Sequence, residues 1–170
     1  VGLMGATGAV AGQNLGAGQP ERAVHAAAVA ARIGLGMATI VGLAFVLIPR
    51  TLLGAFALTE GVGFELGRQL LMYLAVSGFF VTVALSYTGA LQGTGDTRSP
   101  LYISIVSQVI VPVGLCTALS MTRGLTAPDI WLAIVLGHAT RASLSVWRFR
   151  QGRWRTIQIR RSFPSSSTGL

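Results

Sequence analysis

The chain has 170 residues, of which 52% are hydrophobic and only 11% are charged, against about 25% charged residues in an ordinary soluble domain. With a mean hydropathy of +0.65, this composition argues against a water-soluble globular protein. The chain has one cysteine and 13 basic residues, all of them arginine. This excludes a disulfide scaffold, a cysteine-based zinc site and a Walker A loop, which needs a lysine.

Residues 1–18 begin with the apolar stretch Val1–Ala11, which is too short to cross a bilayer, and end in the glycine-rich segment Gly12–Gly18. A signal peptide would have a basic start and a cleavage site. We therefore expect these residues to be the end of a truncated transmembrane helix followed by a turn.

Four longer apolar stretches follow, at about residues 26–49, 69–91, 100–121 and 128–147. About 20 apolar residues at a rise of 1.5 Å each cross a hydrocarbon core of roughly 30 Å. Four such runs leave too little polar surface to coat a soluble fold. The sequence predicts an all-α, polytopic membrane helix bundle over residues 19–158, with a disordered, basic and serine-rich tail at 159–170.

The arginines are distributed unevenly between the two predicted sides of the membrane. The segments 19–32, 92–99 and 148–161 together contain nine arginines and two acidic residues, whereas the loops around Glu60 and Arg123 contain three of each. The positive-inside rule then places the carboxyl terminus and the turn at Asp96 in the cytoplasm. Trp147 and Trp154 fit an aromatic belt at that boundary.

Small residues recur at helical spacing in the first two spans, at Gly34, Ala38 and Gly42 and at Gly78, Thr82, Ser86 and Ala90. Such stripes are typical of close contacts between membrane helices. Thr82 and Ser86 fit either such a contact or the wall of a cavity.

The third span carries Ser104, Gln108 and Pro112 on one helical face. Pro112 has no N–H for the carbonyl of Gln108, so we expect a kink with a free acceptor there, and we expect this polar face to point into the bundle. The kink is either a hinge, a ligand contact or a satisfied packing feature.

In the fourth span His138, Arg141 and Ser145 share a face. Arg141 lies roughly 9 Å from the inner boundary at 1.5 Å per residue, so its side chain can reach the headgroups. His138 either titrates near neutral pH or is hydrogen-bonded to a neighbouring helix. All five acidic residues fall in or next to loops, so we expect no carboxylate relay within these spans.

The turn between the second and third spans contains Gly93 and Gly95, which permit a tight reversal, and Asp96 and Arg98. Asp96 or Ser99 can cap the following helix. The arginine-rich segment 148–161 is better interpreted as a topology anchor that attracts anionic lipids than as a nucleic-acid site, since it directly follows a span. No metal site or nucleic-acid partner is expected.

Three motifs resemble, in order and spacing, the multidrug and toxic compound extrusion (MATE) family. They are Gly12–Ala23 (GQNLGAGQPERA), Gly89–Pro100 (GALQGTGDTRSP) and Arg148–Trp154 (RFRQGRW). The resemblance covers residues 1 to about 158, and the last motif places the sequence in the carboxyl-terminal part of such a chain.

The resemblance implies a fold of twelve helices in two lobes, of which this chain would hold part of the second, and export of drugs or organic cations in exchange for protons or sodium. It implies a transporter component with no cofactor and no enzymatic activity. Its partners would be the missing amino-terminal lobe, membrane lipids and the substrate. Some sodium-driven members carry a carboxylate before the Gly-Asp-Thr-Arg turn, but residues 78–90 contain none.

From these observations we expect the fragment to be inactive alone and to contribute one wall of a substrate path. The candidate lining residues are Gln108, Ser104, Thr82, Ser86 and His138, and the candidate hinge or turn residues are Pro112, Gly93, Gly95, Asp96 and Arg98. Two alternatives remain open, a lipid-linked oligosaccharide flippase of the same superfamily and a non-transporting membrane scaffold.

Overall fold

The structure is a computed structural model that describes residues 2–156, so the predicted tail at 159–170 lies outside the described residues. The elements are α1 (Gly2–Gly16), α2 (Pro20–Leu47), α3 (Pro49–Gly54), α4 (Gly61–Gly93), α5 (Arg98–Ile105), the π-helix η1 (Val106–Ile110), α6 (Val111–Thr122), α7 (Ala127–Arg150) and the 3₁₀ turn η2 (Arg153–Thr156). Within residues 2–156 there is no strand, which confirms the predicted all-α class. Four helices are long and apolar enough to span a membrane: α2, α4, the continuous α5–η1–α6 helix and α7.

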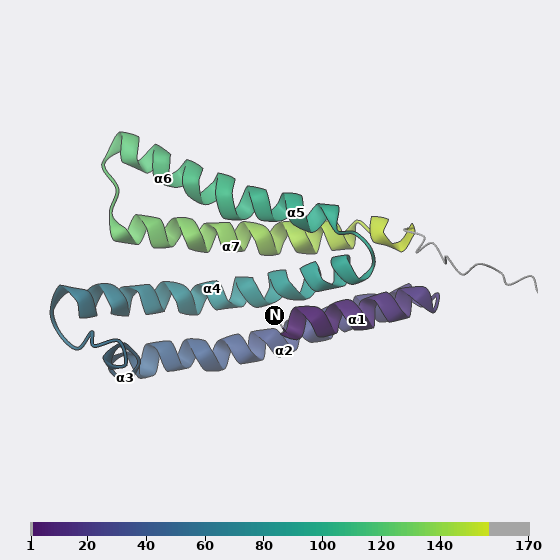
Figure 1. Cartoon of the computed structure of the whole chain (residues 1–170), viewed down its shortest axis with the longest axis horizontal. Coiled ribbons are helices and arrows are strands. Elements are labelled where there is room, and N and C mark those ends of the chain that lie inside the picture. Colours follow the sequence, from purple (N-terminus) through teal and green to yellow (C-terminus); the bar gives the residue numbers. More distant parts are fainter. Residues whose placement is uncertain (1, 157–170) are drawn as a thin grey trace, which may run out of the picture.

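The long helices lie side by side as antiparallel rods (Figure 1). α4 packs against α1 and α2 on one side and against α7 on the other, and the α5–η1–α6 helix packs mainly on α7. The α1–α2 turn, the α4–α5 turn and η2 lie at one end, which we call the arginine-rich end. The loops that contain Glu60 and Arg123 lie at the opposite end, so the loops divide between the two ends as predicted.

The predicted stripes of small residues on α2 and α4 pack against each other. A methyl group added at Gly34 would meet Thr82, one at Gly78 would meet Ala38, and one at Gly42 would meet Ala75. Gly34, Ala38 and Gly42 are all buried. The expectation of a close helix contact is therefore confirmed, because small side chains let the two backbones approach.

A second close contact joins α1 to α4 through two pairs of glycines spaced four residues apart. Cβ atoms at Gly8 and Gly12 would meet the backbone carbonyls of Gly89 and Gly93, and a Cβ at Gly93 would overlap the carbonyl of Gly8. The two backbones therefore touch directly. A G-x-x-x-G spacing on both helices permits this approach.

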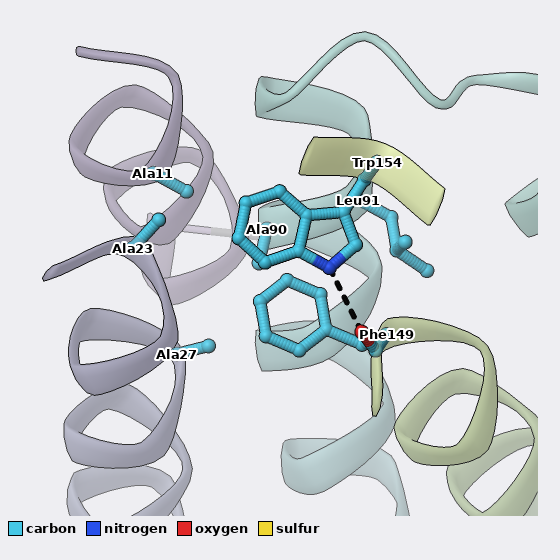
Figure 2. Packing of buried hydrophobic residues seen from close by; sticks show 7 residues of the cluster. All are labelled: Ala11, Ala23, Ala27, Ala90, Leu91, Phe149 and Trp154. Atoms are coloured by element: carbon cyan, nitrogen blue, oxygen red, sulfur yellow. Dashed lines mark hydrogen bonds between the residues drawn. The ribbon is translucent and has the colours of Figure 1, made fainter. Parts of the chain in front are cut away.

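The core lies at the arginine-rich end, where α1, α2, α4, α7 and η2 meet (Figure 2). The rings of Phe149 and Trp154 stack with centroids 4.8 Å apart, and Tyr87 meets the Phe149 ring edge-on. The Trp154 indole Nε1 donates a 2.8 Å hydrogen bond to the Phe149 carbonyl. Trp154 is only 1% exposed, so its predicted place in the aromatic belt is wrong. The chain turns at Gly152 and folds the Trp154 ring back onto alanines of the α1–α2 layer, as Figure 2 shows.

Candidate functional site

Two of the predicted path residues meet in the structure. The Gln108 amide Nε2 on η1 lies 3.3 Å from the imidazole Nδ1 of His138 on α7. Gln108 is exposed on the described chain and His138 is half-buried. The pair therefore offers an amide and an imidazole, both able to donate or accept, at a surface where a further group can approach.

The helix around this pair differs from the simple proline kink that the sequence predicted. Residues 106–110 form a π-turn, in which the Val111 N–H donates to the Val106 carbonyl five residues earlier. The extra residue gives the Pro112 ring room that an α-helix would not. It also shifts the helical register, so that Ser107 is the buried residue of this segment and Gln108 is exposed. The expectation that Gln108 points into the bundle is corrected accordingly.

The Ser107 carbonyl, five residues before Pro112, is turned toward α7. A Cβ at Gly137 would lie 2.5 Å from this oxygen and 3.0 Å from the Pro112 ring. Gly137 thus accommodates both the carbonyl and the proline. Sequence reasoning missed Gly137, because a lone glycine in an apolar run has no visible partner in the sequence.

The other polar residues of α7 face two neighbours. The Ser145 hydroxyl is buried 3.4 Å from the Thr88 hydroxyl on α4, so Ser145 joins α7 to α4. The Arg141 side chain is half-buried, and its Nε has no hydrogen-bond partner among the described residues. Arg141 therefore brings a positive charge to the same stretch of α7 as His138.

The remaining path candidates lie elsewhere. The Thr82 hydroxyl donates to the Phe79 carbonyl and the buried Ser86 hydroxyl donates to the Thr82 carbonyl, both within α4. Thr82 also touches Gly34 in the α2–α4 contact. Ser104 is half-buried on α5, one turn before Gln108. The five candidates thus divide into a packed pair on α4 and a group on α5, η1 and α7.

The turn that precedes α5 is built around a buried carboxylate. Gly95 has φ +93°, a left-handed conformation that glycine adopts without strain. The sequence suggested that Gly93 also forms the reversal. Instead, Gly93 is the last residue of α4 and packs against α1. Asp96 Oδ1 accepts the Ser99 backbone N–H at 3.1 Å and its Oδ2 accepts the Ser99 hydroxyl at 2.8 Å. Arg98 is exposed beside this turn.

Arg148 connects this turn to the end of α7. Its Nε and Nη2 donate to Asp96 Oδ2 at 3.1 and 3.0 Å, and its Nη1 donates to Gln151 at 3.1 Å. Burial raises the pKa of Asp96, but hydrogen bonds from Ser99 and Arg148 outweigh it and hold the pKa below the usual 3.8. Sequence reasoning placed Asp96 and Arg148 on the same side of the membrane but did not pair them, since they are 52 residues apart.

A groove of about 840 Å³ lies between α1 and α2. Its walls are mostly apolar, while Asn14, Glu21, Arg22 and His25 line its end nearest the α1–α2 turn. No sequence motif marked this groove. The signal available was the alternation of small and apolar residues on both helices, which by itself does not distinguish a groove from a packed interface.

Comparison with known proteins gives consistent matches. The MatE family model matches residues 1–117. Probable multidrug resistance protein NorM from Deinococcus radiodurans is 32% identical over 166 residues, which cover 90% of this chain and 36% of that protein. Multidrug resistance protein NorM from Burkholderia vietnamiensis is 30% identical over 141 residues, 79% of this chain and 30% of that protein. No solved structure matches the chain.

The chain spans about a third of the length of the curated relatives it matches. The matched region, residues 1–117, contains α1 to η1 and half of α6, including the glycine contacts and the Asp96 turn. Because the family model covers well over half of the residues, the chain belongs to the MatE family, the multidrug and toxic compound extrusion proteins.

Proposed function

We propose that the protein forms part of a secondary active efflux transporter, which exports drugs or toxic organic cations in exchange for protons or sodium ions and needs no cofactor. The family match over residues 1–117 carries this proposal. Since the chain spans about a third of its relatives, transport would require the remainder of such a protein, including an amino-terminal lobe.

The packing suggests how the chain would act in such a machine. Alternating access requires bodies that rock without deforming around a substrate site. The contacts of α4 with α1 and α2 bring backbones together through glycine and alanine, which favours a rigid layer. The α5–α7 side instead carries Gln108, His138 and Ser104, and we propose these as substrate-path residues. The contacts of Thr82 and Ser86 favour a packing role.

A chimera tests the transport proposal. This chain would replace the aligned third of the Deinococcus radiodurans relative, and ethidium efflux would be measured in cells that express the chimera. We expect the chimera to export ethidium when an inward ion gradient is present. We expect no export from this chain alone. A chimera that inserts and purifies as a folded protein but shows no gradient-dependent efflux would contradict the proposal. Ion-independent retention of dye would favour a scaffold.

Membrane sidedness forms a separate part of the proposal, with the arginine-rich end cytoplasmic in a multi-pass arrangement. Cys116 is the one native cysteine, so a Cys116→Ser background permits single-cysteine labelling. Cysteines placed at Glu60 and at Gln151 should react with an impermeant maleimide from opposite sides of the membrane. Labelling of both from one side would refute the arrangement.

A further inference from the structure

A second cavity lies at the arginine-rich end, between the start of α5 and the last turns of α7. Its volume is about 340 Å³. The residues nearest the chain end are polar: Arg148, Gln151 and Arg153. One turn deeper the walls become apolar: Ile103 lies four residues after Ser99 on α5, and Leu144 lies four residues before Arg148 on α7. At 1.5 Å per residue, polarity changes over roughly 6 Å of depth.

The position of this cavity matches the boundary of a membrane. Both helices that form it are apolar enough to span a bilayer, and its aromatic walls, Tyr102 and Trp147, are 66% and 61% exposed. Tyrosine and tryptophan with one face open are typical of the headgroup level. A cavity with this lining suits the depth at which headgroups give way to acyl chains.

The charge around the cavity is positive. Among the arginines of residues 148–156, Arg148 pairs with Asp96 and Arg155 pairs with Glu21. Arg150 and Arg153 form no ion pair within the described residues. Arg153 is exposed at the rim. Guanidinium groups bind phosphate oxygens in a planar, bidentate geometry, and basic pockets between membrane helices suit anionic headgroups.

We propose that this cavity is a binding site for one anionic phospholipid, whose phosphate is held by Arg153 and whose acyl chain lies along Ile103, Leu144 and Trp147. The Asp96–Arg148–Gln151 hydrogen bonds fix the inner wall of the site. A free phosphate would use only the polar rim, whereas the change from polar to apolar lining follows the order of groups in a lipid. This proposal depends on the membrane-spanning helices and not on the transport activity proposed above.

Native mass spectrometry of the full chain in detergent tests the site, with phosphatidylglycerol as the probe and phosphatidylcholine as the neutral comparison. We expect phosphatidylglycerol to bind and phosphatidylcholine to bind much more weakly. Arg153→Gln should weaken phosphatidylglycerol binding by roughly fivefold, the effect of removing one basic residue near an anionic surface. Arg153→Lys should retain most of the binding. Arg22→Gln is the matched control, because it removes the same charge at the same end but from α2.

Several results would overturn the proposal. Equal weakening by Arg22→Gln and Arg153→Gln would indicate diffuse attraction and no defined site. Equal binding of phosphatidylcholine would show that headgroup charge is irrelevant. Displacement of the lipid by inorganic phosphate or by glycerophosphoglycerol, the same headgroup without chains, would identify a free phosphate compound as the ligand. Circular dichroism of each variant establishes that it is folded before binding is compared.

Discussion

The two sides of α4 are joined to the rest of the molecule in different ways. Toward α1 and α2 the contacts are made by glycine, alanine and Thr82, with backbones in direct contact. Toward α7, and from α7 to the α5–η1–α6 helix, the contacts include hydroxyl and amide pairs and a π-turn around Pro112. The first kind of interface has no room for a methyl group at Gly34, Gly89 or Gly93, whereas the second contains side chains that can change partners. Substitutions at tightly packed glycines should therefore act on stability in either interface, whereas substitutions at the exposed amide of Gln108 in the second should act mainly on function.

The strongest effect is expected at Gly93. A methyl group there would overlap the Gly8 carbonyl, so Gly93→Ala should force α1 away from α4 and cost about 3 kcal/mol of unfolding free energy, the upper range for overpacking. Thermal unfolding in detergent, followed by circular dichroism, measures this. Gly36→Ala is the matched control, because nothing lies within 4 Å of its added Cβ. It should be neutral or stabilising by up to about 1 kcal/mol. Equal effects at the two positions would contradict the rigid contact.

The next effect is expected at Asp96, which is 7% exposed. Asp96→Asn leaves the Arg148 guanidinium partly buried without its counter-charge, which we expect to cost about 2 kcal/mol. Thermal unfolding at neutral pH measures the loss, with Glu65→Gln in the exposed Glu65–Arg68 pair as the control, expected to lose well under about 1 kcal/mol.

The same carboxylate gives the stability a pH dependence. The folded-state pKa of Asp96 is lowered from 3.8, so its contribution is fully present above the unfolded-state pKa and is lost as pH falls through the folded-state value. The unfolding midpoint should decline below about pH 5. Asp96→Asn should remove this part of the decline, and an unchanged slope in the variant would show that Asp96 does not titrate on unfolding.

Gly137 is expected to show a smaller effect, because its contact includes a proline ring and a turn that can adjust. Gly137→Ala brings a methyl group against the Ser107 carbonyl and the Pro112 ring, and we expect a loss of about 1–2 kcal/mol. Gly114→Ala on α6 is the control, because nothing lies within 4 Å of its added Cβ. If Gly137→Ala is as mild as Gly114→Ala, the π-turn does not rest on α7 as described.

The same comparison shows what the sequence could predict. Hydropathy and helix length identified the four apolar helices, since a span follows from local composition alone. The α2–α4 stripes were found because both carry small residues at a four-residue spacing. The α1–α4 contact carries the same signal at Gly8, Gly12, Gly89 and Gly93, but Gly93 was assigned to the turn before α5 and Gly12 to the glycine-rich segment after the first stretch. Spacing alone does not decide whether a glycine packs or bends.

The site was less predictable, because its geometry depends on register and distant pairing. α-Helical spacing gave Gln108 and Pro112 a shared inward face, but the π-turn adds a residue and buries Ser107 instead. The Asp96–Arg148 pair joins residues 52 positions apart. Trp154 resembled an interfacial residue because its burial depends on the chain folding back at Gly152. Each of these features arises from tertiary structure and not from local propensity.

The smallest effect on stability is expected at Gln108. A comparison of Gln108→Leu with Thr82→Val should separate the two interfaces by their effects on unfolding and on efflux. Gln108→Leu keeps the volume but removes the bond to His138, and such bonds between membrane helices contribute about 0.6 kcal/mol on average. A bond this weak can be exchanged for a bond to a passing ligand at little cost. We therefore expect thermal unfolding of Gln108→Leu to be nearly unchanged, while ethidium efflux by the chimera falls. Thr82→Val on α4 should show the opposite pattern: any loss of ethidium efflux should be no greater than the loss of folded protein. If Gln108→Leu instead unfolds far more readily, Gln108 is a packing residue and the substrate path must lie along another face.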